Sequence, residues 1–137
     1  MISAVSLGLA SEAVARSIDY ANERQSFGKP IIEHELVGSK LADMVAQLEA
    51  ARLLVYRSAL RMDEGREMPL DSAVTKLFSS EMATRVCMDA IQVHGGYGYL
   101  KDYDVERFMR DAKLCEIGEG TSEILRVVIA RSLRRRS

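Results

Sequence analysis

The run from Glu116 to Ile124 places one carboxylate, Glu119, between Gly118 and Gly120, directly before a helical pattern. Glycine has no Cβ, so a ligand can approach the backbone closely on either side of this carboxylate. A following helix N-terminus favours the ionised carboxylate, and burial under an apolar ligand opposes it. These conditions suit a general base. The alternative is an exposed loop carboxylate beside an N-cap at Gly120 or Thr121, which the local pattern alone favours.

A second candidate binding segment lies between two helical patterns. Arg24 carries a planar fork of donors that suits phosphate oxygens, and Phe27 offers a ring that can pack on another planar ring. Gly28 and Pro30 then favour a tight turn. The alternative is a helix end with one basic residue and one apolar anchor.

A third candidate runs from Gln92 to Gly98. The paired Gly95 and Gly96 allow close approach of a ligand, and the Gln92 amide can both donate and accept hydrogen bonds. The segment is not a dinucleotide-binding fingerprint, because no strand precedes it and the glycine spacing differs. A glycine C-cap with a tight turn is the alternative.

Apolar residues at helical spacing predict the elements that position these segments. One such stripe includes Leu41, Met44 and Leu48. Gly65 marks the end of that helical pattern, and Pro69 stands where a proline suits the start of the next helix. No strand pattern is evident. We therefore predict an all-α, up-and-down four-helix bundle of long helices with short extra helices. Its expected helices are Ser3 to Asn22, Glu33 to Glu64, Pro69 to about Val93, Val105 to Ala112, and a last one after Gly120.

Taken together and in this order, the motifs resemble the C-terminal helical domain of the acyl-CoA dehydrogenases. The matching segments are Glu23 to Ile31, Gln92 to Gly98, Arg110 to Lys113 and Gly118 to Thr121. The resemblance covers about Ile2 to Arg131. Members of that family carry two further domains upstream, one helical and one β-rich. The resemblance therefore implies that residues 1–137 are a single C-terminal domain without those two, and that this chain alone is inactive.

The resemblance implies oxidation of an acyl-CoA thioester to the trans-2-enoyl-CoA. Glu119 matches the base that removes the α-proton, and Gly120 beside it would contact the substrate. Some branches place the base on the first helix of this domain, where this chain has Ser3, Ala4 and Ser6. Many relatives have a tyrosine before the catalytic glutamate, so Gly118 implies a roomier acyl pocket.

The resemblance also implies FAD as the cofactor and a homo-oligomer, either a dimer or a tetramer. An electron acceptor flavoprotein would be a further partner. Glu35, beside His34, departs from the family, because a carboxylate there would repel a pyrophosphate. By position, the residues expected at the flavin of a neighbouring subunit are Arg24, Phe27, Gln92, Gly95 and Gly96, with His34 also against the cofactor, and those at the flavin of the same subunit are Thr121 and Glu123.

Composition limits the other functional classes. With 137 residues, 47% of them hydrophobic, and a net charge of −1, the chain has neither a nucleic-acid nor a membrane footprint and is expected to be cytoplasmic. The triplet of residues 134–136 is interpreted as a solvated helix end. Cys87 and Cys115 predict no disulfide or metal site, and Cys87 is expected in the core. Two alternatives to the dehydrogenase remain: a catalytically inactive oligomerisation module and a domain of an acyl-CoA oxidase-like flavoprotein.

Overall fold

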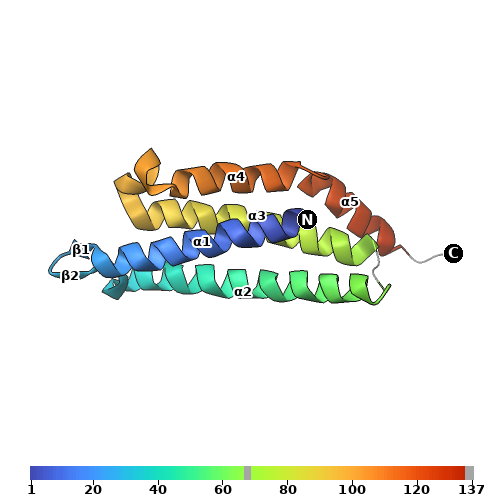
Figure 1. Ribbon diagram of the computed structural model, residues 1–137, viewed down its shortest axis with the longest axis horizontal. Helices are drawn as coiled ribbons and strands as arrows, with labels where there is room; N and C mark the ends of the chain where they lie inside the picture. The colour runs from blue at the N-terminus through green and yellow to red at the C-terminus, as the bar shows by residue number, and fades with distance from the viewer. Residues whose placement is uncertain (67–68, 135–137) are drawn as a thin grey trace.

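A computed structural model describes residues 1–66 and 69–134, and this part of the chain folds as a bundle of long helices (Figure 1). The predicted all-α fold is confirmed. Helices α1, α2 and α3 run side by side, and α4 with α5 follow one another along the remaining side of α3. The helices are α1 (Ile2–Glu23), α2 (Glu35–Asp63), α3 (Pro69–His94), α4 (Val105–Ile117) and α5 (Ser122–Ser132).

Helix α3 is the centre of the bundle and packs against each of the other four helices. A helix in that position must bury residues around most of its circumference, and α3 does so with small side chains that allow close approach. The core that it forms with α1, α2 and α4 includes Ala10, Met44, Met82, Val86 and Phe108. Cys87 is fully buried there, as predicted.

The helix ends confirm the glycine and proline signals. Gly65 has φ 66°, and it follows α2 in a motif in which the Arg66 N–H donates to the Arg61 carbonyl at 2.8 Å. The Gly65 N–H donates to Met62 at 3.0 Å, which completes a Schellman cap. Pro69 is the first residue of α3. Residues 135 and 136 of the arginine triplet lie outside the described residues.

Three details differ from the sequence prediction. The turn at Gly28 belongs to a small hairpin of β1 (Gln25–Ser26) and β2 (Lys29–Pro30), whose central residues Phe27 and Gly28 both have positive φ. Two residues in that conformation make a type I′ turn, and strands this short leave no alternating pattern to read. The predicted start of the second helix is a 3₁₀ turn, η1 (Ile31–Glu33). Helix α4 also runs five residues beyond Ala112, to Ile117.

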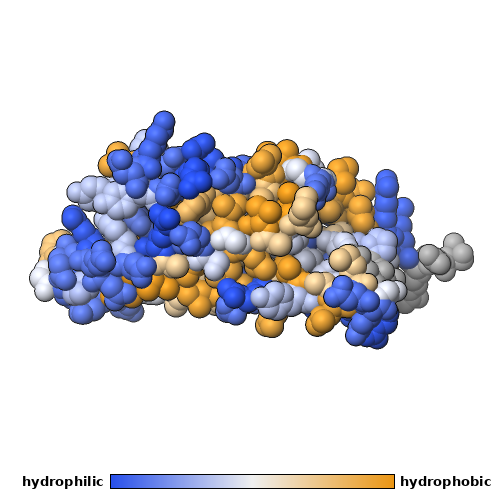
Figure 2. Space-filling view, viewed as in Figure 1, coloured by the Kyte–Doolittle hydropathy of each residue, from blue (hydrophilic) through white to orange (hydrophobic). Residues whose placement is uncertain are grey.

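Apolar surface remains outside this core. Helix α2 buries Leu41, Met44, Leu48 and Ala51, but beyond Ala51 it leaves the core. Figure 2 shows apolar residues across the middle of one face of the molecule. None of the described helices combines the length and apolarity that crossing a membrane requires. The exposed large apolar residues in this second half of α2 are Leu53, Tyr56, Leu60 and Met62.

Candidate functional site

Glu119 stands in a short turn between α4 and α5. The Gly118 N–H closes the end of α4 with a hydrogen bond to the Leu114 carbonyl at 2.8 Å. Glu119 then has φ 54° and Gly120 has φ 103°. The left-handed region is unfavourable for a residue with a side chain, so the surrounding structure must hold Glu119 there. The side chain of Glu119 is exposed.

Helix α5 begins directly after this turn, as predicted. Thr121 is the N-cap, and its side-chain oxygen accepts a hydrogen bond from the Ile124 N–H at 3.4 Å. Hydrogen bonds from its own backbone N–H and from the Thr121 hydroxyl lower the pKa of Glu123 below its ordinary value. Thr121 and Glu123 therefore both stabilise the N-terminus of α5. They lie two and four positions after Glu119.

The Glu119 turn lies at the edge of a cleft of about 570 Å³. Its wall is mostly apolar and is built by four helices. Among the described residues that line it, Glu119 has the one carboxylate side chain and Lys76 the one cationic side chain. The lining residues are Met1, Ile2, Ser3, Ala4, Val55, Ser58, Ala59, Met62, Pro69, Ser72, Ala73, Thr75, Lys76, Glu119, Leu125 and Val128.

The start of α1 faces the same cleft as Glu119. Ser3 and Ala4, two positions considered for the base in the sequence analysis, line the wall but carry no carboxylate. Ser6 is fully buried, and its hydroxyl donates to the Ile2 carbonyl at 3.1 Å. The carboxylate available to a ligand in this cleft is therefore that of Glu119.

Lys76 is a residue of this site that the sequence analysis missed. It lies on α3 with only 9% of its surface exposed, and its Nζ donates to the Gly120 carbonyl at 2.5 Å. A second, longer hydrogen bond reaches the Glu116 carbonyl at 3.4 Å. A sequence signal for Lys76 was available. Its neighbours on the same helix face, Ala73, Ser79 and Ser80, are all small, and in the structure all three are buried.

A second pocket, of about 430 Å³, lies at the hairpin end of the bundle. It brings together three predicted cofactor residues, Arg24 from the end of α1 and Gly95 with Gly96 from η2 (Gly95–Tyr99). The Arg24 guanidinium carbon lies 5.6 Å from the centre of the Tyr97 ring. Gly95 has φ 60°, and a Cβ built on either glycine would meet no atom within 4 Å. Open space therefore faces both glycines.

The other residues predicted for this end are placed differently. Phe27 is 98% exposed at the hairpin tip, and its ring is nearly perpendicular to that of His34, with 6.1 Å between the centroids. The His34 Nε2 lies 3.0 Å from the Ser26 hydroxyl and 3.2 Å from the Ser26 carbonyl, so this nitrogen is engaged within the hairpin. Gln92 is exposed near the end of α3 and is not among the residues that line the pocket.

The predicted cofactor residues thus form two groups, one at the hairpin end of the bundle and one at the turn between α4 and α5, near the start of α1 (Figure 1). Arg24 follows the last residue of α1, whereas the first residues of α1 line the Glu119 cleft. Helix α1 has 22 residues, which corresponds to about 33 Å at 1.5 Å per residue. One copy of the chain therefore presents the Arg24 group and the Thr121 group about 33 Å apart.

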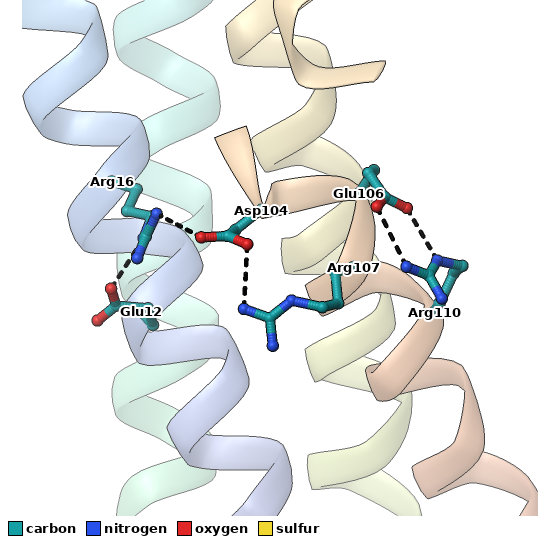
Figure 3. Close-up of polar contacts among 6 residues, drawn as sticks. All are labelled: Glu12, Arg16, Asp104, Glu106, Arg107 and Arg110. Carbon is teal, nitrogen blue, oxygen red and sulfur yellow. Dashed lines mark hydrogen bonds and ion pairs between the residues drawn. The ribbon is translucent and has the colours of Figure 1, made fainter. Parts of the chain in front are cut away.

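A network of charged side chains joins α1 to the start of α4 (Figure 3). Asp104, with φ 57°, accepts hydrogen bonds from Arg16 and from Arg107, each at 3.1 Å. Arg16 also bonds to Glu12 at 2.8 Å. The network is largely exposed, so each pair contributes little stability. It links Asp104, the N-cap of α4, to α1.

The described residues thus form an all-α bundle with an apolar cleft beside Glu119 and a separate pocket at Arg24, Gly95 and Gly96. The family model for the acyl-CoA dehydrogenase C-terminal domain matches residues 1–134. The chain therefore belongs to the acyl-CoA dehydrogenase family, in agreement with the sequence analysis.

Individual relatives agree with this assignment. The chain is 52% identical over 132 residues to the probable acyl-CoA dehydrogenase YngJ of Bacillus subtilis strain 168, which covers 96% of this chain and 35% of that protein. The solved butyryl-CoA dehydrogenase of Megasphaera elsdenii is 43% identical with a TM-score of 0.96, over 98% of this chain and 35% of that one. An FAD complex of PigA is 34% identical with a TM-score of 0.92, over 96% and 34%. The chain thus spans about a third of the length of these relatives.

Proposed function

We propose that this chain is the part of an FAD-dependent acyl-CoA dehydrogenase that supplies the catalytic base, part of the flavin site and the oligomer interface. The observation that carries the proposal is the placement of Glu119 on a left-handed turn at the edge of an apolar cleft. The family and the butyryl-CoA dehydrogenase of similar structure support acyl-CoA as the substrate class.

Glu119 is suited to remove the α-proton of a thioester. Its side chain is exposed in this chain and lines the cleft, where a ligand can reach it. An acyl chain in the apolar cleft would exclude water from the carboxylate, and desolvation makes an ionised carboxylate a stronger base. Gly120, next in the chain, leaves room for the substrate because it has no Cβ.

The residues of the second pocket fit an anionic ligand with planar rings. Arg24 supplies a guanidinium fork for phosphate oxygens, and the space beside Gly95 and Gly96 admits a ligand close to the backbone. Phe27 offers an exposed ring at the tip of the hairpin that follows Arg24. Bound FAD would supply the acceptor for the hydride that leaves the β-carbon of the substrate. The same ligand is proposed to contact Gln92 and His34, which do not line the pocket in this chain.

The separation of the two groups of cofactor residues supports a homo-oligomer. Thr121 and Glu123 lie beside the base and would contact the flavin that serves it, whereas Arg24 is about 33 Å away along α1. In a dimer or tetramer, the Arg24 group of one copy can contribute to the flavin of another. The exposed apolar half of α2 supplies surface for such contacts. An electron acceptor flavoprotein completes the proposed partners.

A complete enzyme built with this chain as the C-terminal domain, behind the upstream two thirds of the Bacillus subtilis relative, tests the proposal. We expect a yellow, FAD-containing oligomer whose flavin absorbance is bleached by butyryl-CoA without oxygen. The chain alone is expected to form a dimer or tetramer without turnover, since proximity to the other substrate-binding groups is missing. A folded, FAD-loaded chimera that no acyl-CoA bleaches would contradict the proposal.

A further inference from the structure

The Gly120 carbonyl is held by a buried cation from another helix. Lys76 on α3 donates from Nζ to this carbonyl at 2.5 Å and to the Glu116 carbonyl at 3.4 Å. Glu116 is in the last turn of α4, where carbonyls have no partner within the helix. Lys76 therefore binds the end of α4 and the residue that follows Glu119 at the same time.

Burying the Lys76 ammonium removes it from water, which is unfavourable for a charged group. Burial lowers the pKa of Lys76, while the nearby Cys115, Glu116 and Glu119 act in the opposite direction. An unbranched apolar side chain of similar length would fill the same space without desolvating a charge. What the ammonium adds, compared with such a side chain, is a directed hydrogen bond to the turn that carries the carboxylate.

The other hydrogen bonds of the turn involve the residues on either side of Glu119 and Gly120. On one side the Gly118 N–H bonds to Leu114, and on the other the Thr121 side chain and carbonyl accept from the start of α5. Between them lie Glu119 and Gly120, both with positive φ. A peptide in that conformation relaxes readily unless a contact holds it, and the contact at its carbonyl comes from Lys76.

We propose that Lys76 is the positioning residue for the base: its ammonium fixes the Gly120 carbonyl and so keeps the Glu119 carboxylate directed at the cleft. The part of this proposal that concerns catalysis rests on the proposed role of Glu119. Lys76 itself acts on the backbone of the turn and not on the reacting atoms.

The first test uses the chain itself and does not depend on activity. Amide hydrogen exchange is compared between the wild type, Lys76→Met and Lys113→Met. Lys113 is an exposed lysine that bonds to the Glu116 side chain at 2.6 Å, so it controls for loss of a nearby positive charge. We expect exchange over residues 118–125 to become at least about 10-fold faster in Lys76→Met alone, with α1 and the middle of α3 unchanged.

Two outcomes overturn the proposal. One is an unchanged turn in a folded Lys76→Met variant, and the other is an equal effect of Lys113→Met. If Lys76→Met does not fold, Lys76→Gln is judged by the same criteria, because its neutral amide fills part of the space and reaches less far. Lys76→Arg, which keeps a charged donor, should retain more protection of the turn than Lys76→Met.

The second test uses the complete enzyme. Misplacing a base by about 1 Å can reduce a rate by about 100-fold, so we expect Lys76→Met to lower kcat by that order with KM changed less than about 3-fold. In a Glu119→Gln background the same substitution should lower kcat no further, because Lys76 acts through Glu119. A full additional loss would show a general structural defect and overturn the proposal. Retained turnover in Glu119→Gln alone would instead refute the role of Glu119 and leave the exchange result standing.

Discussion

The guanidinium of Arg24 lies over the ring of Tyr97, with 5.6 Å between its central carbon and the ring centroid. Arg24 ends the first helical segment and Tyr97 belongs to η2, so this contact joins two connections that are far apart in the sequence. A cation over a tyrosine face is attracted by the ring quadrupole. The contact keeps Arg24 beside Gly95 and Gly96, at the mouth of the second pocket.

Arg24→Lys should weaken FAD binding in the complete enzyme. The substitution keeps the charge but removes the planar fork and much of the stacking on Tyr97, so we expect the Kd for FAD to rise about 10-fold, or about 1.4 kcal/mol. Recovery of flavin fluorescence on dilution measures the Kd. Arg131→Lys, an exposed arginine on α5, is the control. Equal affinities of Arg24→Lys and wild type would remove Arg24 from the flavin site.

Two glycines of the same segment should respond differently to alanine. A Cβ on Gly98 would lie 2.6 Å from the Ile91 carbonyl oxygen and 2.9 Å from the His94 Cβ, whereas one on Gly96 meets nothing within 4 Å. We expect Gly98→Ala to lower the free energy of unfolding by about 1–3 kcal/mol, and Gly96→Ala to change it by less than about 0.5 kcal/mol. Urea denaturation of the chain measures both. In the complete enzyme, Gly96→Ala should still weaken FAD binding. Equal stabilities of the two variants would contradict the packing described for Gly98.

His94 should make the fold less stable in mild acid. The ring is 3% exposed and stacks on Tyr20 at 4.3 Å between centroids, and its Nδ1–H donates to the Ala90 carbonyl at 2.8 Å. Burial lowers the pKa of His94 below its ordinary 6.5, although the bond to Ala90 opposes the shift. Protonation therefore favours the unfolded chain, and the stability contributed above pH 6.5 is lost as the pH falls below that value.

Unfolding free energies at pH 8, 6.5 and 5 test this linkage. We expect wild type to lose stability across the interval, and His94→Phe, which keeps an aromatic ring against Tyr20, to lose less. A His94→Phe variant with the same slope as wild type would assign the pH dependence to other groups.

Cys87 should be inert in the folded protein. The thiol is fully buried, and burial raises the pKa of Cys87 to about 12, with further contributions from Cys115 and Asp111. The thiolate is the reactive form of cysteine, so at pH 8 very little of Cys87 can react. We expect no modification by a thiol-specific disulfide reagent in buffer and rapid modification in concentrated urea. Fast labelling of Cys87 without denaturant would mean that the α3 core opens readily.

The helices could be predicted from sequence because each carries its own local signals. Gly65 and Pro69 mark a helix end and a helix start by their backbone preferences, and the stripe through Leu41, Met44 and Leu48 marks a buried face. The hairpin at Phe27 could not be predicted in the same way. Its two-residue strands are stabilised by one turn and by the contact of Ser26 with His34, and neither leaves a periodic pattern.

The turn at Glu119 could be predicted, because its flanking glycines and the helix start that follows them are local signals. The role of Glu119 as the base stays a prediction. Lys76 was missed because its role depends on packing between α3 and the end of α4, which no local spacing reports. The meeting of Arg24 with Gly95 is also a tertiary contact. The sequence analysis placed Arg24 and Gly95 at one ligand only through the family resemblance, and not from the spacing of the residues.

The measurement that tests the central claim most directly is exchange of the substrate α-proton in deuterated water by the complete enzyme with Glu119→Gln. The matched control is Glu116→Gln, which makes the same charge change three residues earlier and leaves the carbonyl that Lys76 binds. General-base catalysis typically contributes about 10²–10⁴-fold, so we expect Glu119→Gln to slow α-proton exchange and turnover by that range while FAD stays bound. Glu116→Gln should stay within a few fold of wild type. Exchange at the wild-type rate in FAD-loaded Glu119→Gln would contradict the assignment of Glu119 as the base.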